Sequence, residues 1–174
     1  MIDSPHITWS DDGRGFATTA PAYREFVRSA RLRPMAATQI RRLREGADIV
    51  AVGAVIRTAF CDAEIPPGVV AAIEEAYQKL GGADVELQVS GTAAGEPLDE
   101  FFTGPQEVFL HVTGLQALLA ACKRCWASLY NDRAIIYREV RDIDQLSVDL
   151  CVVARPMTDL DFAADTIDQV LGRV

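Results

Sequence analysis

The stretch from Val85 to Arg138 constrains the fold most, because it changes from strand to helix periodicity around one long polar loop. Its order is strand, loop, strand, helix, helix. The loop, Ser90–Pro105, is sixteen residues long and contains three glycines and two prolines. Hairpin loops need only about two to five residues, and longer loops inside a domain are usually functional or mobile. We therefore expect a functional site at this loop.

The segments on either side of the loop have clear local patterns. Val85–Val89 and Gln106–Val112 alternate as strands do, which predicts Val108, Leu110 and Val112 on one face of the second strand. The other face is predicted to carry Glu107, Phe109 and His111. Thr113 and Gln116 have the spacing of a capping box, so we expect a helix to begin there. Its apolar stripe comprises Leu115, Leu118, Leu119, Cys122, Trp126 and Leu129, and Asn131 is predicted to cap a following helix, 132–140.

The rest of the chain is predicted to be mostly helical. Residues 1–18 are expected to form a loose or weakly paired segment ending in a short strand near Gly15–Thr18. The predicted helices span about 21–32, 36–46, 49–62 and 69–80, with Gly81–Gly82 as a left-handed end to the last. Near the C-terminus we expect a strand, 146–154, stopped by Pro156, and an amphipathic helix, 158–174.

Length and composition favour a single soluble domain over residues 1–174. The chain is 49% hydrophobic and 24% charged, which is ordinary for a globular protein. Its net charge of −8 argues against a nucleic-acid partner, which requires clustered Lys and Arg. The longest apolar run, Ile49–Ile56, is too short to span a membrane, and the N-terminal residues lack the pattern of a signal peptide. We therefore expect a cytoplasmic location.

Cys122 and Cys125 form a C-x-x-C pair, which raises the alternative of a zinc or thiol-redox protein. No second such pair is present, and His6 and His111 lie far away in the sequence. Both cysteines also fall inside the predicted amphipathic helix and not at the turn before it. The pattern therefore favours buried cysteines that pack as small hydrophobic residues.

Several motifs resemble one known family. Gly104–Leu110 (G-P-Q-E-V-F-L) is similar to its G-Q-Q-E-T-F-L, and 125–130 (C-W-A-S-L-Y) to its C-W-A-S-L-F. Arg133–Arg138 (R-A-I-I-Y-R) resembles R-A-I-S-Y-R, and Ala22–Phe26 resembles an early helix. The region 20–155 thus resembles the N-terminal ATP-grasp-like domain of the pyruvate, phosphate dikinase, phosphoenolpyruvate synthase and rifampicin phosphotransferase family.

This resemblance implies a fold and a ligand. It implies an α/β (α+β) fold, with a small, mostly antiparallel or mixed sheet packed against several amphipathic helices. It further implies ATP and Mg²⁺ as ligands, for transfer of a phosphoryl group to a histidine on a separate domain. By the same resemblance, the nucleotide-binding residues are Gln88, Thr92, Gly104, Gln106 and Glu107.

The chain departs from the family pattern where phosphate would be bound. The family loop V-R-S-S-A-T-A-E-D reads 87–95 L-Q-V-S-G-T-A-A-G here, so Gln88 stands in place of a phosphate-contacting arginine. The acidic pair is replaced by Ala94 and Gly95, and no lysine precedes Lys79, so the opening G-G-K-N-A-S-L motif has no counterpart. Ala154 takes the place of a glutamine in the family's V-V-V-Q-R-M-V.

Two main hypotheses for the function follow from this resemblance. A third, the zinc or thiol-redox protein, was described above. The sequence favours a degenerate, non-catalytic domain acting as a regulatory or interaction module, with a protein partner or a second copy of itself. The alternative is an ATP-dependent phosphotransferase component completed by another chain. No residue is assigned a catalytic role. Gln106 and Glu107 are interpreted as residues on a wet strand face, Trp126 and Phe109 as core, and Arg24, Arg28 and Arg31 as a solvated basic face.

Overall fold

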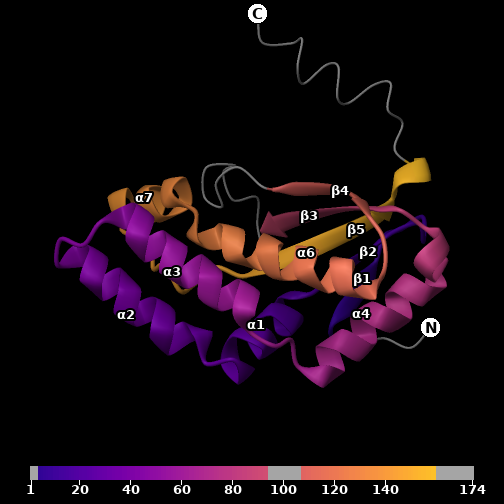
Figure 1. Ribbon diagram of the computed structural model, residues 1–174, viewed down its shortest axis with the longest axis horizontal. Helices are drawn as coiled ribbons and strands as arrows, with labels where there is room; N and C mark the ends of the chain where they lie inside the picture. The colour runs from indigo at the N-terminus through magenta and orange to yellow at the C-terminus, as the bar shows by residue number, and fades with distance from the viewer. Residues whose placement is uncertain (1–3, 94–106, 160–174) are drawn as a thin grey trace, which may run out of the picture.

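The computed structural model describes residues 4–93 and 107–159, which form one antiparallel sheet covered by helices (Figure 1). The sheet has five strands in the order β1-β2-β5-β3-β4. The strands are β1 (Ile7–Trp9), β2 (Phe16–Thr18), β3 (Leu87–Ala93), β4 (Val108–Val112) and β5 (Leu150–Pro156). The expected α/β class with an antiparallel sheet is confirmed.

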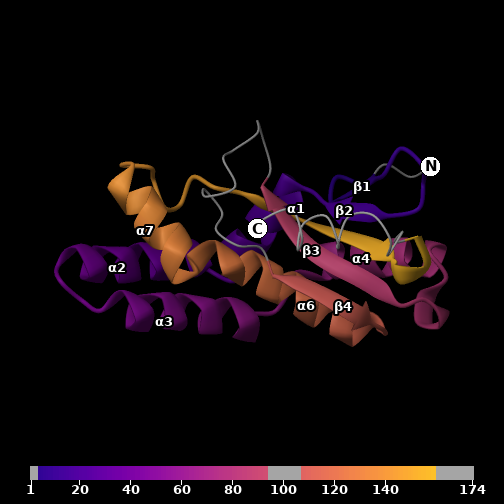
Figure 2. The same cartoon turned by 90° about the horizontal axis from the view of Figure 1, so that it is seen from above.

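The helices gather on one side of the sheet (Figure 2). Helix α6 packs on β3, β4 and β5, α1 packs on β5, and α4 contacts α1, α6 and β1. Helices α2, α3 and α7 extend beyond the end of the sheet in both views. The helices are α1 (Ala20–Ser29), α2 (Leu32–Arg44), α3 (Ile49–Asp62), α4 (Pro67–Lys79), α6 (Leu115–Ala127) and α7 (Asp132–Val140), with short 3-10 turns η1 (Gly82–Asp84), η2 (Ser128–Tyr130) and η3 (Met157–Asp159). None of the described helices is long and apolar enough to cross a membrane.

The N-terminal segment forms a short hairpin over its described part, and its second strand, β2, lies where a short strand was expected. Strands β1 and β2 pair as a hairpin, with Ile7 opposite Thr18 and Trp9 opposite Phe16. The Ser10 hydroxyl donates to Asp12 Oδ1 (2.6 Å), and Gly13 takes a positive φ of 69° in the turn. Phe16 is buried and its ring meets that of Trp9 edge-on, so the hairpin is held by packing as well as by pairing.

Most predicted helix boundaries are confirmed, with two corrections. The second helix begins at Leu32, not Ala36, because a proline in the first turn loses no intrahelical hydrogen bond and Pro34 is tolerated there. The predicted capping box is also wrong. The N-cap of α6 is Gly114, without a side-chain cap, and its N–H donates to the Tyr77 hydroxyl (2.8 Å). The breaks at Gly46 and 62–67 and the positive φ angles of Gly81 and Gly82 are as predicted.

Strands β3 and β5 begin and end at other residues than the sequence predicted. β3 starts at Leu87 and continues to Ala93, four residues into the predicted loop. β5 starts at Leu150 and ends at Pro156, which forms its last residue instead of stopping it at 154. Cross-strand pairing explains both extensions, since each residue from Leu87 to Ala93 is opposite a residue of β5. The expected helix at 158–174 lies almost entirely outside the described residues.

Strand β4 does not present the predicted faces. Val108 and Leu110 are 50% exposed, whereas Phe109 is half-buried against the core and Val112 is buried. The register shifts between the pairs Leu87–Val112 and Val89–Phe109, so β4 has a bulge there. His111 within it takes a φ of 56°. A bulge adds one residue on one strand, so the strict alternation assumed from sequence fails at this point.

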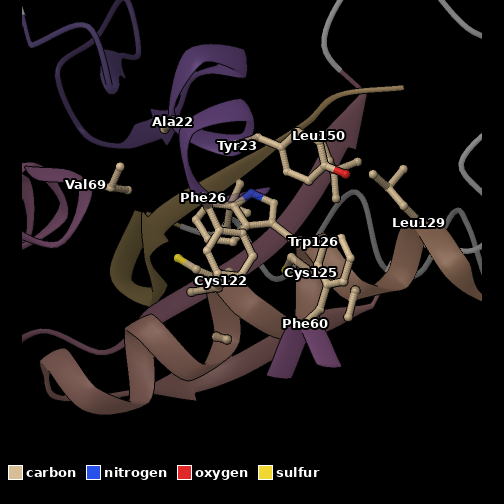
Figure 3. Packing of buried hydrophobic residues seen from close by; sticks show 14 of the residues in the cluster. Ala22, Tyr23, Phe26, Phe60, Val69, Cys122, Cys125, Trp126, Leu129 and Leu150 are labelled. Atoms are coloured by element: carbon tan, nitrogen blue, oxygen red, sulfur yellow. The ribbon is translucent and has the colours of Figure 1, made fainter. Parts of the chain in front are cut away.

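An aromatic cluster links α1, α3 and α6 in the core (Figure 3). The Trp126 ring stacks on Phe26 with centroids 4.8 Å apart and lies 6.3 Å from Tyr23. Phe60 of α3 meets Phe26 edge-on. Trp126, Phe26 and Phe60 are fully buried, which confirms Trp126 as a core residue.

Candidate functional site

The face of the sheet opposite the helices carries part of the predicted site. Leu87 and Val89 on β3 are fully buried toward the helices, so the alternating residues Gln88, Ser90 and Thr92 lie on the other face. The same alternation places Cys151, Val153 and Arg155 of β5 on this face. We call these six residues, together with Val108 and Leu110 of β4, the open face.

Gln88 and Arg155 are directly opposite each other on the open face. Gln88 is half-buried and Arg155 is exposed. Within the described part of the chain, neither side chain makes an ion pair or a side-chain hydrogen bond. The Gln88 amide NH2 and the Arg155 guanidinium can both donate to one anion, so this pair is suited to bind phosphate or carboxylate oxygens.

Arg155 was missed as a site residue by the sequence analysis. Its signal was the alternation of Cys151, Val153 and Arg155, but the predicted strand ended at 154, two residues before its observed end, and so left Arg155 out. Thr92 lies further along the open face, opposite Cys151, and is exposed. The structure therefore brings Gln88 and Thr92 onto one strand face, with Arg155 beside Gln88.

Glu107 is not part of this group. Glu107 lies two residues before Phe109, so in an extended chain the two side chains point to the same face. Because Phe109 pairs with the buried Val89, this is the face that the helices cover. The Glu107 carboxylate forms an ion pair with Arg124 of α6 (3.2 Å), and the Arg124 guanidinium also lies 4.4 Å from the centroid of the Phe109 ring. The predicted site is thus divided by the sheet. Gly104 and Gln106 lie outside the described residues.

Glu107 instead borders a polar cavity of about 630 Å³ on the helix side. In this cavity Arg57 donates to the Tyr130 carbonyl (2.7 Å) and pairs with Asp132 (3.1 Å). These contacts join α3 to the start of α7, so the Arg57 guanidinium has a structural role. The other lining residues are Cys61, Arg124, Ala127, Ser128, Asn131 and Arg133.

The C-x-x-C pair is part of the core. Cys122 and Cys125 are each 1% exposed, and their thiols are free. Burial raises the pKa of the Cys125 thiol to about 12 and that of Cys122 still further. Among the described residues no three His, Cys, Asp or Glu side chains are grouped to hold a metal ion. The prediction that both cysteines are buried is confirmed.

Comparison with known proteins identifies the family. The sequence profile described as "Pyruvate phosphate dikinase, AMP/ATP-binding domain" matches residues 12–166. The chain belongs to this family. The relationship that the motifs indicated is therefore established over most of the sequence, including all five strands except the first.

Three similar relatives are named as phosphoenolpyruvate synthases, one of them as a probable one. The chain is 33% identical over 156 residues to the probable phosphoenolpyruvate synthase of Methanothermobacter thermautotrophicus, covering 86% of this chain and 23% of that protein. It is 35% identical to phosphoenolpyruvate synthase of Synechocystis sp. (88% and 20% covered) and 36% identical to that of Escherichia coli (88% and 20%). The chain spans about a fifth of the length of these relatives.

Proposed function

We propose that the domain binds an adenine nucleotide weakly on its open face and acts as an interaction module without transferring phosphate by itself. The observation that carries this proposal is the pair Gln88–Arg155. Gln88 stands where the resembling motif has an arginine, and Arg155 is the one lysine or arginine within the five described strands.

Charge explains why binding would be weak and transfer absent. Phosphoryl transfer depends on several cations that converge on the phosphates and neutralise charge in the transition state. The described open face supplies one guanidinium. The amide of Gln88 can donate a hydrogen bond, but charge-assisted bonds to phosphate are about twice as strong as neutral ones.

Few residues of the open face could bind Mg²⁺-ATP. Arg155 and Gln88 would hold phosphate oxygens, and the Thr92 hydroxyl would accept or donate a further hydrogen bond. Mg²⁺ would supply charge neutralisation on the phosphates, but no described carboxylate of the strands lies on the open face to hold it.

Half-exposed apolar side chains on the open face support the interaction role. Val108 and Leu110 are each 50% exposed on β4, which lies at the edge of the described sheet. Apolar patches and unpaired strand edges are typical of protein interfaces. The alternative, an ATP-dependent phosphotransferase component completed by another chain, draws on the same observation, since a second protein segment on this face would bring the missing cations.

Restoring the arginine is the sharpest test of the nucleotide site. We expect wild-type protein to bind Mg²⁺-ATP with a Kd in the millimolar range by calorimetry, and Gln88→Arg to bind about tenfold more tightly, because one charge-assisted bond replaces a neutral one. Gln116→Arg adds the same charge on the exposed side of α6 and should leave the affinity unchanged. Equal tightening by both variants, or unchanged binding by Arg155→Ala, would contradict the site.

The interaction role is tested separately. Sedimentation velocity of the wild type and of a Val108→Thr/Leu110→Thr variant measures whether copies associate through the open face. We expect the wild type to associate at high concentration and the variant to remain monomeric with unchanged stability. Transfer of labelled phosphate from ATP by the purified chain would overturn the non-catalytic assignment and favour the phosphotransferase alternative.

A further inference from the structure

A second cavity lies on the helix side of the sheet, where α1, the start of α2 and the approach to β5 meet. Its volume is about 290 Å³, at the lower end of the range of small-molecule sites. It is separated from Gln88 and Arg155 by the sheet. Its lining residues are Tyr23, Arg24, Val27, Arg28, Arg31, Leu32, Arg33, Pro34, Phe60, Tyr130, Leu146 and Asp149.

The floor of this cavity is aromatic. Tyr23, Phe60 and Tyr130 are at most 4% exposed and belong to three different elements, α1, α3 and η2. The Tyr23 and Phe60 rings are stacked at 6.5 Å, and the Phe60 and Tyr130 rings lie 5.3 Å apart. Tyr23 and Tyr130 each keep a small exposed area at the base of the opening, while Phe60 is fully buried and packs against both. An apolar base of this kind suits a flat apolar group.

The rim is strongly cationic. Arg24, Arg28, Arg31 and Arg33 all border the opening and are exposed, whereas Asp149 is the one acidic lining residue. Asp149 is already paired, because Arg24 Nε donates to its carboxylate (2.7 Å). In a chain with a net charge of −8, four arginines around one opening form a marked local excess of positive charge.

Within the described residues, two of the four rim arginines have no side-chain partner and can therefore bind a ligand. Arg33 donates to the Leu146 carbonyl (2.8 Å), which fixes it to the loop before β5. Arg28 and Arg31 make no ion pair and no side-chain hydrogen bond within the described residues. Since they lie three positions apart across the end of α1, both can approach the same anion at the cavity mouth.

The first turn of α2 adds to this positive field. α2 is a 13-residue helix whose N-cap, Arg31, takes a left-handed conformation (φ 53°) and makes no side-chain cap. No acidic residue occurs in the first turn, so its partial positive charge is not neutralised by the helix itself. Leu32, Arg33 and Pro34 of this turn line the cavity, which places the helix terminus at the rim.

We propose that this cavity binds a small organic anion whose flat apolar body rests on Tyr23 and Tyr130, the two rings that pack against the fully buried Phe60. The carboxylate, sulfonate or phosphate group of the ligand meets Arg28 and Arg31 at the start of α2. The apolar floor selects for the ring or chain of the ligand, and the rim selects for a single negative head group. Neither feature alone is sufficient for binding.

Three probes of the purified chain separate these contributions. Naphthalene-2-sulfonate carries both parts, 2-naphthol carries the ring system without an anion at pH 7, and inorganic sulfate carries the anion without the ring. We expect calorimetry to show saturable binding of naphthalene-2-sulfonate at least tenfold tighter than either other probe. Backbone-amide NMR shifts should be centred on Val27 and Leu32.

Matched arginine variants locate the site. Arg28→Gln/Arg31→Gln should weaken naphthalene-2-sulfonate binding at least tenfold. Arg41→Gln/Arg42→Gln removes the same charge from the other end of α2, outside the cavity, and should change binding less than twofold. Val27→Phe, which fills the cavity, should abolish binding while the melting temperature shows that the protein remains folded.

The proposal is overturned by several results. Equal affinity for 2-naphthol would indicate an apolar cavity without anion selection, and equal affinity for sulfate would indicate a charged surface without a pocket. Equal weakening by both double arginine variants would indicate a general charge effect. Absence of binding by any probe to the folded wild type would exclude this class of ligand.

Discussion

Arg138 shows how a motif residue can serve the fold. Its side chain is completely buried, and its guanidinium donates to Gln145 Oε1 (2.7 Å) and to the Leu129 carbonyl. Gln145 in turn donates to the Ile135 carbonyl (2.9 Å) and to Glu139 (3.0 Å). Burial lowers the pKa of this guanidinium. The network joins η2, α7 and the loop before β5. Arg138 therefore holds together the motif segments 125–130 and 133–138.

Removing Arg138 should therefore destabilise the protein strongly. We expect Arg138→Ala to lower the free energy of unfolding by about 3 kcal/mol, because Gln145 and a buried carbonyl lose their partner. Arg138→Lys should recover little, since an ammonium cannot reproduce the planar fork. Urea denaturation measures both. Arg141→Ala, on the exposed end of α7, is the control and should cost about 0.5 kcal/mol or less.

The buried thiol of Cys125 predicts a pH dependence. Its pKa is raised to about 12 in the folded protein, first by burial, and returns to its usual value near 9 on unfolding. Above pH 9 the folded state thus binds more protons, so this thiol contributes stability that is lost as pH rises from 9 to 12. We expect the free energy of unfolding of wild type to fall by about 1.4 kcal/mol per pH unit more than that of Cys125→Ala in this window.

Urea denaturation at pH 7.5, 8.5 and 10.5 checks this expectation. Between pH 7.5 and 8.5 the difference between wild type and Cys125→Ala should stay constant, which provides an internal control. Parallel curves up to pH 10.5 would show that the thiol ionises normally in the folded protein, in conflict with its buried position.

At the scale of single elements, the bulge in β4 decides which side chains face the helices. It lies at His111, whose φ of 56° is unusual for a non-glycine residue, and whose Nδ1 lies 2.7 Å from Glu86 Oε2. The bulge lets Val112 remain buried opposite Leu87 while Phe109 returns to the core side opposite Val89. Val108 and Leu110 are left on the open face as a result.

Substitutions at His111 should follow backbone conformation more than charge. We expect His111→Val to lower the free energy of unfolding by about 1 to 2 kcal/mol, because a β-branched residue is strained at positive φ. His111→Gly should stay within about 0.5 kcal/mol of wild type, since glycine adopts this conformation freely. Thermal and urea unfolding measure both, with Glu86→Gln as a control for the exposed contact between His111 and Glu86. Equal losses for Gly and Val would show that the contact with Glu86 dominates.

At the scale of the whole molecule, Trp126 is the point where three helices meet the sheet. It contacts Phe26 and Tyr23 of α1, and these rings contact Phe60 of α3 (Figure 3). The same apolar cluster includes Leu87, Val89 and Leu150 of the sheet. One continuous core of this kind predicts cooperative unfolding of sheet and helices together.

Trp126→Ala should cost about 3 to 5 kcal/mol, because it leaves a large cavity among these rings. Trp126→Phe should cost far less, about 1 kcal/mol. The buried indole N–H has no hydrogen-bond partner within the described residues, so its removal loses no bond. Circular dichroism and fluorescence should give coincident urea transitions in each variant. Separate transitions would show that helices and sheet form independent cores.

Local patterns in the sequence determined the elements and their order. Proline and glycine at Pro21, Gly46 and Gly81 fixed helix ends because their backbone preferences act over one or two residues. Apolar spacing predicted the buried stripe of α6, including Cys122 and Trp126, since one helix face must pack inward. The family motifs are local in the same sense, and they were confirmed over most of the chain.

Tertiary structure alone decided which side of the sheet each site residue occupies. Gln88 and Glu107 fall in neighbouring family-like motifs, yet the sheet separates them. The face that each side chain occupies depends on the register with β5 and on the bulge at His111. The arginine-rimmed cavity likewise joins residues 24 and 149, which only packing of α1 against the start of β5 brings together. Periodicity has a range of a few residues, whereas register and packing depend on contacts between distant segments.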